Sequence, residues 1–149
     1  MRAVVQRVNW AKVEVEGKVT GRIDAGLCVL VGVGRDDDES HAKWLAQKTL
    51  AARIFKDDAG KMNRSVLDIG GKVLAISQFT LFGDLRKGTR PSFTAAMAPE
   101  RAVQLFDSFC EHGRQLGVDV ATGVFGAHME VTLDNTGPVT LLLDSHRLF

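Results

Sequence analysis

The sequence predicts one compact α/β domain, residues 1–149, in which a mostly antiparallel or mixed β-sheet packs against two principal helices. Three observations predict this class. The first third alternates apolar and polar residues as short strands do, and two later stretches repeat apolar residues at helical spacing. No linker, internal repeat or low-complexity segment divides the chain, which is 45% hydrophobic and 25% charged. We expect the sheet to be a barrel-like meander.

The N-terminal third is expected to form four short strands. The longest nearly apolar run, residues 25–34, is rich in glycine and too short to cross a bilayer, so it predicts a buried strand. Gly17 supplies a turn between the second and third strands. The four strands are predicted at Arg2 to Val8, Ala11 to Glu16, Lys18 to Ile23 and Leu27 to Val33.

Two helices are expected to cover the sheet. Acidic residues from Asp36 to Glu39 precede the first helix, and we interpret them as favourable partners of a helix start rather than as a metal site. Pro99 opens the second helix, which ends between Gly113 and Gly117. Each helix carries one apolar stripe: Ala42, Leu45, Ala46, Leu50 and Ile54 on the first, and Ala102, Val103, Phe106, Phe109 and Cys110 on the second.

The remaining segments are loops and strands. Alternation stops at Gly137 and Pro138, and the local sequence favours a hairpin turn there. The other option is a pair that presents its backbone to something outside the chain. Loops are predicted at 56–71 and 83–97, and strands at Val73 to Gln78, Val118 to Val124 and on both sides of the Gly-Pro pair.

Composition limits the functional classes. A formal net charge of +1 argues against a protein that coats nucleic acid with its whole surface, although it permits a local basic patch. Polar Gln6 and Arg7 interrupt the N-terminal stretch that a signal peptide would need to be apolar, so we expect a cytoplasmic protein. Cys28 and Cys110 lack CxxC spacing, which indicates reduced core cysteines.

Residues 77–93 combine a polar strand end with a basic loop. Arg86, Lys87 and Arg90 could neutralise phosphates, although a solvated basic loop is the simpler interpretation of these three residues alone. Phe93 could stack on a base or anchor the loop to the core. The segment is therefore a candidate nucleic-acid contact.

The sequence contains no evident side-chain catalytic machinery. Ser77 and Thr80 are candidate nucleophiles, but such hydroxyls need an activating base, and no histidine is near them in the sequence. No HExxH, GxSxG, Walker or dinucleotide-binding motif occurs. The four histidines are scattered, and we interpret His41, His112 and His128 as surface residues.

Two segments carry a family resemblance. "SQFTL" at 77–81 and "NTGPVT" at 135–140 resemble the signature segments of the D-aminoacyl-tRNA deacylases. The resemblance extends along the chain in the same order, because the opening strand, "GLCVLVGV", "GDLRKGTRPSF" and "AMAPE" are also similar to that family. It implies a single deacylase domain spanning residues 1–149.

The resemblance implies a hydrolase that cleaves the ester of D-aminoacyl-tRNA and also removes glycine mischarged onto tRNA(Ala). It further implies a homodimer with the active site at the subunit interface, and a reaction that uses no metal, no cofactor and no membrane. Ser77, Gln78, Phe79 and Thr80 would line the pocket for the terminal adenosine and the ester. Gly137 and Pro138, joined by a cis peptide, would enter the other subunit's pocket and screen chirality, with Arg7 as a tether.

Main-chain catalysis would explain the missing histidine. An aminoacyl ester is already activated, and the neighbouring ribose 2′-hydroxyl could help to deliver a nucleophile. Backbone N–H groups of Phe79 and Thr80 would then stabilise the oxyanion. Two alternatives remain: Thr80 as a covalent nucleophile, or a non-catalytic nucleic-acid-binding module that needs only the basic loop.

Overall fold

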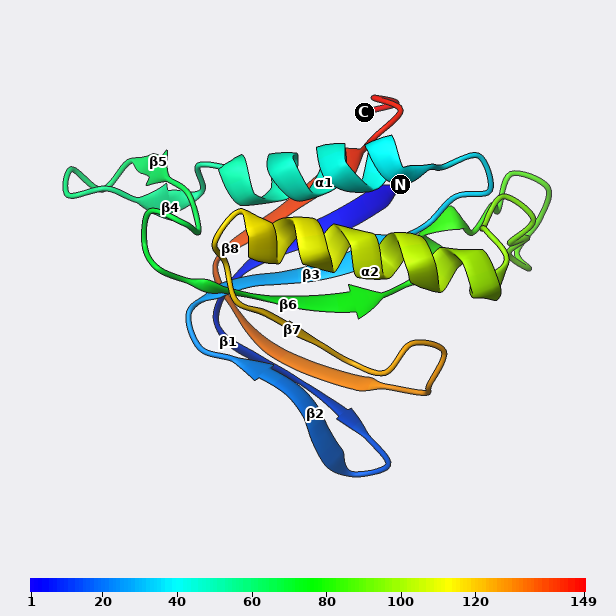
Figure 1. The fold of residues 1–149 in the computed structure, drawn as a ribbon, viewed down its shortest axis with the longest axis horizontal. Coiled ribbons are helices and arrows are strands. Elements are labelled where there is room, and N and C mark those ends of the chain that lie inside the picture. Colours follow the sequence, from blue (N-terminus) through cyan, green and yellow to red (C-terminus); the bar gives the residue numbers. More distant parts are fainter.

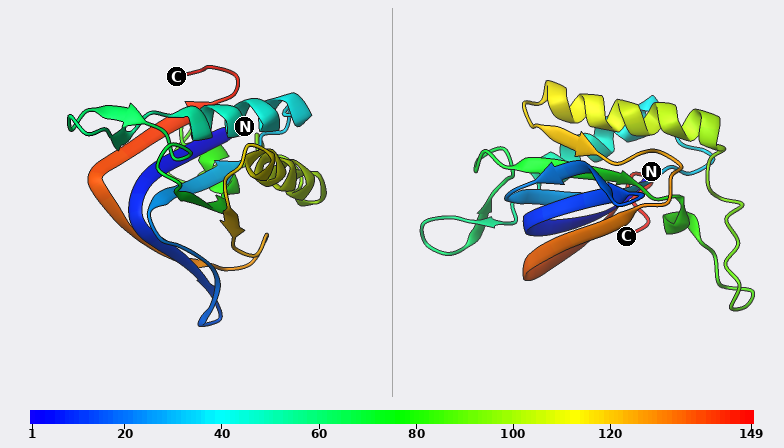
Figure 2. Two further views of the ribbon diagram at one scale, coloured as in Figure 1. Left: turned by 60° about the vertical axis from the view of Figure 1, so that its left-hand side comes forward. Right: turned by 90° about the horizontal axis from the view of Figure 1, so that it is seen from below.

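Six strands form one mixed sheet that curls until its two ends approach each other (Figures 1 and 2). The computed structural model describes residues 1–149. The sheet order is β2-β1-β3-β6-β7, with β8 paired to β1. β1 is antiparallel to its three neighbours, whereas β3, β6 and β7 run parallel. The strands are β1 (Arg2–Val15), β2 (Lys18–Ile23), β3 (Gly26–Gly32), β6 (Lys72–Ser77), β7 (Val120–Thr122) and β8 (Glu130–Asp144).

The end strands β2 and β7 nearly close the sheet. A Cβ added to Gly21 of β2 would lie 2.5 Å from the carbonyl oxygen of Thr122 in β7, so the two backbones are in close contact. The predicted class, an α/β domain with a mixed, barrel-like sheet and two principal helices, is confirmed. No helix combines the length and the apolar character needed to cross a membrane.

Helices α1 (Glu39–Ala51) and α2 (Pro99–Gln115) pack against each other on one face of the sheet (Figure 1). Asp38 caps α1, because its side chain accepts hydrogen bonds from the backbone N–H groups of Ser40 and His41. The bond from the Ser40 side chain is the main cause that lowers the pKa of Asp38 to about 2. Asp38 is therefore a partner of the helix start, as predicted for the acidic run. Ile54, predicted on the apolar stripe of this helix, lies beyond its end at Ala51.

The sheet buries apolar residues on both faces. Below the helices, the core includes Val29, Val31 and Val73. On the other face the core is smaller: Val8, Ala11, Val13, Ile23, Cys28, Leu74 and Ile76. Burial raises the pKa of both the Cys28 and the Cys110 thiol to about 12, so neither cysteine is poised to react as a thiolate.

Two predicted boundaries were wrong. The first two predicted strands are one continuous strand, because β8 pairs with β1 on both sides of Asn9 and over almost its whole length. Residues 56–71 are not only loop. The short strands β4 (Phe55–Lys56) and β5 (Met62–Arg64) pair there as a small separate sheet.

The predicted hairpin turn at Gly137 and Pro138 was also wrong. β8 continues through the pair, and both of its halves bond to β1. Gln6 faces Thr140 and Val8 faces Asn135. Residues 136–139 therefore lie opposite Arg7 alone and form a large bulge. The Asn135 side chain braces this bulge by accepting from the Val139 N–H at 2.8 Å. The chain therefore keeps its direction and pushes the Gly-Pro pair out of the ladder.

Candidate active site

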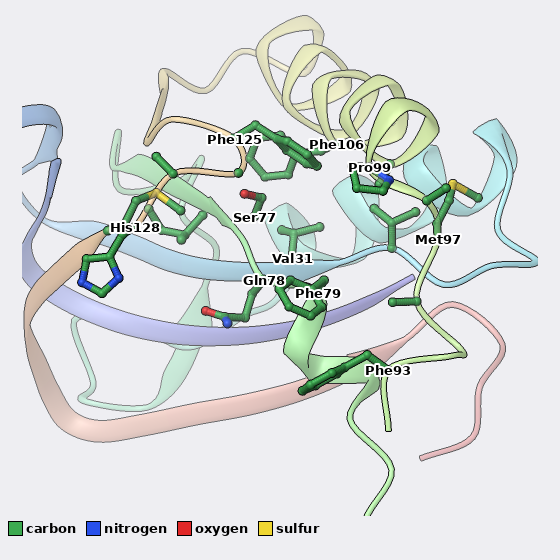
Figure 3. A pocket seen from close by; sticks show the side chains of 18 of the residues that line it. Val31, Ser77, Gln78, Phe79, Phe93, Met97, Pro99, Phe106, Phe125 and His128 are labelled. Atoms are coloured by element: carbon green, nitrogen blue, oxygen red, sulfur yellow. The ribbon is translucent and has the colours of Figure 1, made fainter. Parts of the chain in front are cut away.

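A pocket of about 850 Å³ opens where β6 ends (Figure 3). Four segments far apart in sequence form it: the end of β3 with the residues up to 35, the end of β6 with Phe79, residues 93–98 with the N-terminal half of α2, and residues 125–131, which lead from the β7–β8 link into β8. Its walls are mainly apolar and include two aromatic rings, Phe106 and Phe125, whose centroids lie 6.1 Å apart. A mostly apolar hollow with a few polar groups is the usual form of a small-ligand site.

Ser77, Gln78 and Phe79 lie along one side of this pocket, where Ser77 and Gln78 contribute polar side chains (Figure 3). They follow one another at the end of β6 and lead into the short 3-10 helix η1 (Phe79–Phe82). The N–H groups of Phe79 and Thr80 belong to the first turn of η1, where backbone donors have no acceptor within the helix. These two donors are therefore available to a ligand.

Thr80 stands at the edge of the site rather than inside it. It is exposed and does not line the pocket, and its Oγ1 lies 2.5 Å from the donating Nε2 of Gln78. Neither Thr80 nor Ser77 forms a hydrogen bond with a histidine or a carboxylate. The geometry thus offers no activating base for either hydroxyl.

Residues 125–129 line the pocket and were missed in the sequence. His128 lies at its mouth and forms no hydrogen bond or ion pair within the chain (Figure 3). We interpreted it only as a surface residue, and it is indeed exposed. The apolar run around it, Val124 to Met129, was the available signal, because an exposed strand connection is seldom so rich in large apolar side chains.

The bulge at Gly137 and Pro138 lies away from the pocket of its own chain, since neither residue lines it. The Gly137–Pro138 peptide bond is cis, as the resemblance implied. Buried Arg7 fixes the bulge from below. Its Nε donates to the Thr136 carbonyl at 3.0 Å and its Nη1 donates to the Ile54 carbonyl at 2.5 Å.

The basic loop is exposed, but its charges are not equivalent. The Arg86 guanidinium donates to both carboxylate oxygens of Asp84, with the shortest distance 2.6 Å. This pairing holds the pKa of Asp84 well below its usual range and raises the pKa of Arg86. Lys87 and Arg90 have no such partner. Phe93 packs edge-on against Phe79 at 5.0 Å between ring centroids, so it connects the loop to the pocket.

A family model described as D-Tyr-tRNA(Tyr) deacylase matches residues 4–144, which include the whole pocket and the bulge. The chain belongs to this family. Proteins named D-aminoacyl-tRNA deacylase from Koribacter versatilis and Thermosipho africanus are 58% and 55% identical over 149 residues, covering 100% of both chains. The expected family is therefore confirmed, and with it an enzyme family of hydrolases.

Solved structures agree with this deacylase family fold. The c-Myc DNA unwinding element binding protein is 39% identical and superposes with a TM-score of 0.92, covering 97% of this chain and 98% of its own. A probable eukaryotic D-amino acid tRNA deacylase superposes with a TM-score of 0.82 over 95% of this chain and 97% of its own. At 20% identity, the second likeness shows the fold alone.

Proposed function

We propose that this chain hydrolyses the ester of D-aminoacyl-tRNA in the cytoplasm, and that it also removes glycine from mischarged glycyl-tRNA(Ala). The observation that carries the proposal is the pocket at the end of β6, whose apolar and aromatic walls lie beside the start of η1, where the N–H groups of Phe79 and Thr80 have no acceptor within the helix. The family membership and the relatives named as deacylases support the same substrate.

The reaction is assigned to main-chain groups. The terminal adenosine occupies the apolar pocket, and the ester carbonyl faces the N–H groups of Phe79 and Thr80. These donors stabilise the oxyanion, and one such donor typically contributes 10²–10³ in rate. The 2′-hydroxyl of the substrate's terminal ribose positions the water molecule that attacks the ester. Ser77 and Gln78 orient the ribose and the ester, and no metal or cofactor takes part.

Selection by chirality is assigned to a second copy of the chain. Gly137 and Pro138 are exposed and do not line the pocket of their own chain, so they are free to enter the pocket of another copy. Arg7 keeps the bulge in shape through its two carbonyl contacts. A backbone wall that excludes L side chains by collision has nothing to collide with in glycine, so it also admits glycyl-tRNA. The active protein is therefore a homodimer.

Two alternatives are kept. Thr80 could attack covalently, but its only side-chain partner is Gln78, which is not a base. A nucleic-acid-binding module without catalysis is favoured by one observation: the relative that is 39% identical is named as a protein that binds a DNA unwinding element. Such a module needs only the basic loop.

One assay separates these functions. The same tRNA is charged with the D or the L form of one amino acid, and glycyl-tRNA(Ala) is prepared in parallel. We expect release of the D-amino acid and of glycine, with the L ester left intact. Inertness toward all three substrates would leave the binding module, whereas equal hydrolysis of D and L esters would remove the chirality filter.

The second test concerns the basic loop. Reversing both charges, Arg86→Glu with Lys87→Glu, is expected to weaken tRNA binding and to reduce the slope of log K against log salt by about one. We expect the loss of one phosphate contact rather than two, because the Arg86 guanidinium is already paired with the Asp84 carboxylate. Titration of labelled tRNA at several salt concentrations measures it.

A matched variant controls for net charge. Lys43 lies on α1 and Lys61 between β4 and β5, and both are exposed. Lys43→Glu with Lys61→Glu changes the charge of the chain equally but should leave the slope unchanged. If both double variants lowered the slope alike, the loop would be a solvated surface and not a tRNA contact.

A further inference from the structure

The start of α1 lies beside the segment after β8 (Figure 1). Three side chains of types that can bind a metal ion gather there, outside the pocket. Asp37 directly precedes the helix cap, His41 belongs to the first turns of α1, and His146 follows β8. One ligand atom from each of these three residues lies within 4.8 Å of the other two. Two imidazoles and one carboxylate form a donor set that suits Zn²⁺ and neighbouring transition metals.

The two imidazole rings are already side by side. Their centroids are 4.4 Å apart with 30° between the ring planes. His146 Nε2 lies 2.8 Å from Asp37 Oδ1, and His41 Nδ1 lies 2.8 Å from Asp38 Oδ1. His41 Nδ1 also accepts from the backbone N–H of Asp38 at 3.1 Å, so both contacts of this ring use Nδ1, and Nε2 has no partner within the chain. Proteins commonly orient metal-binding histidines through the ring nitrogen that does not bind the ion.

The Asp37 side chain is held in place. It is fully buried, and its two oxygens accept from the backbone N–H of Gly34 and from the Met1 amine, each at 2.5 Å. Within the acidic run, Asp38 caps the helix and Glu39 bonds to His112, whereas Asp37 takes no part in the cap and points inward to the cluster. No local pattern indicates this division, because His146 lies more than one hundred positions away from the acidic run.

We propose that Asp37, His41 and His146 bind a divalent transition-metal ion, best matched by Zn²⁺, which fastens the segment after β8 to the start of α1. The ion takes the place of the proton between His146 Nε2 and Asp37 Oδ1. Zinc bonds to nitrogen and oxygen ligands are about 2.0–2.2 Å long, so their ligand atoms stand about 3–4 Å apart. The three ligand atoms already lie within 4.8 Å of one another, and the His146 side chain, 43% exposed, has room to adjust toward this spacing.

The ion is structural and not catalytic, since none of its ligands lines the pocket. Water completes its coordination. The positively charged Met1 amine beside Asp37 opposes a second cation, so we expect micromolar rather than nanomolar affinity.

The test uses the full chain without a polyhistidine tag, because such a tag binds the same metals. Calorimetric titration with ZnCl₂ is expected to show one ion per chain, and saturating Zn²⁺ should raise the thermal midpoint by roughly 5 °C in a manner reversed by EDTA. MgCl₂ should do neither, because imidazole ligands do not suit Mg²⁺. The variants are His146→Ala and His41→Ala, and the matched control is His112→Ala, which removes another histidine bonded to a carboxylate.

We expect at least a tenfold loss of Zn²⁺ affinity in His146→Ala and in His41→Ala, and an unchanged affinity in His112→Ala. His146 is half exposed and outside regular structure, so its variant should fold even if His41→Ala weakens the helix cap. Absence of Zn²⁺ binding, equal binding of Mg²⁺, or an unchanged affinity in His146→Ala would each overturn the proposal.

Discussion

Turnover of D-aminoacyl-tRNA by the Thr80→Ala variant is expected to stay within about threefold of the parent protein, whereas a tRNA ending in 2′-deoxyadenosine should react at least about 100-fold more slowly. The alanine variant keeps the backbone N–H at position 80, and Thr80 Oγ1 contacts only Gln78. The deoxy substrate loses the one hydroxyl that main-chain catalysis assigns to the attack. Single-turnover release of the amino acid measures both rates.

The two results must occur together. A folded Thr80→Ala protein without activity, or an acyl group trapped on Thr80, would shift the assignment to covalent catalysis. Gln78→Ala provides a matched control, because it removes the partner of Thr80 without changing either backbone donor. We expect it to affect KM more than kcat, since Gln78 lines the pocket and its proposed part is to orient the substrate.

Gly137→Ala is expected to lower kcat/KM for D-aminoacyl-tRNA by about 100-fold, because misplacement of a site by about 1 Å costs roughly that factor. At φ +129°, Gly137 has a conformation that L side chains rarely adopt. A Cβ there would lie 2.7 Å from Nη2 of Arg7 and 2.9 Å from Cγ2 of Val139. Either the bulge or the Arg7 guanidinium must move, and Arg7 is buried between two carbonyls.

The control for this variant is Gly17→Ala. Gly17 also has a positive φ, +76°, but nothing lies within 4 Å of its added Cβ, in the turn between β1 and β2. It should lose stability and keep full activity. Equal loss of activity in both variants, or full activity in Gly137→Ala, would show that the bulge has no part in the reaction. Circular dichroism and a melting curve establish that each variant is folded.

Much of the fold follows from local patterns in the sequence. Alternation in residues 11–16 and the helical spacing of Ala102, Phe106 and Phe109 are short-range signals, and both identify real elements. The polar strand end at Ser77 and the apolar strand before it were also predictable, because burial is encoded residue by residue. Local patterns thus predict the α/β class and the polar strand end at Ser77, which is one part of the candidate site.

The bulge that we propose as the second part of the site depended on strand pairing. The local sequence at Gly137 and Pro138 predicts a turn. It carries no information about Arg7, which is 130 positions from Gly137 and lies opposite the pair in the strand ladder. Backbone hydrogen bonds to β1 on both sides of the pair hold β8 straight, and these bonds outweigh the turn preference of glycine and proline. Only a partner strand could decide between a turn and a bulge.

The same reason applies to the pocket and to the cluster of Asp37, His41 and His146. Phe125 and His128 join Ser77 because β7 runs parallel to β6 and carries the following segment to the same end of the sheet. His146 reaches Asp37 because β8 returns along β1 and ends beside the start of α1. The sequence by itself determined which residues are strand, helix or polar strand end, since those preferences act between near neighbours. The tertiary structure alone decided which of them meet, because strand pairing and helix packing bring together residues that no local pattern connects.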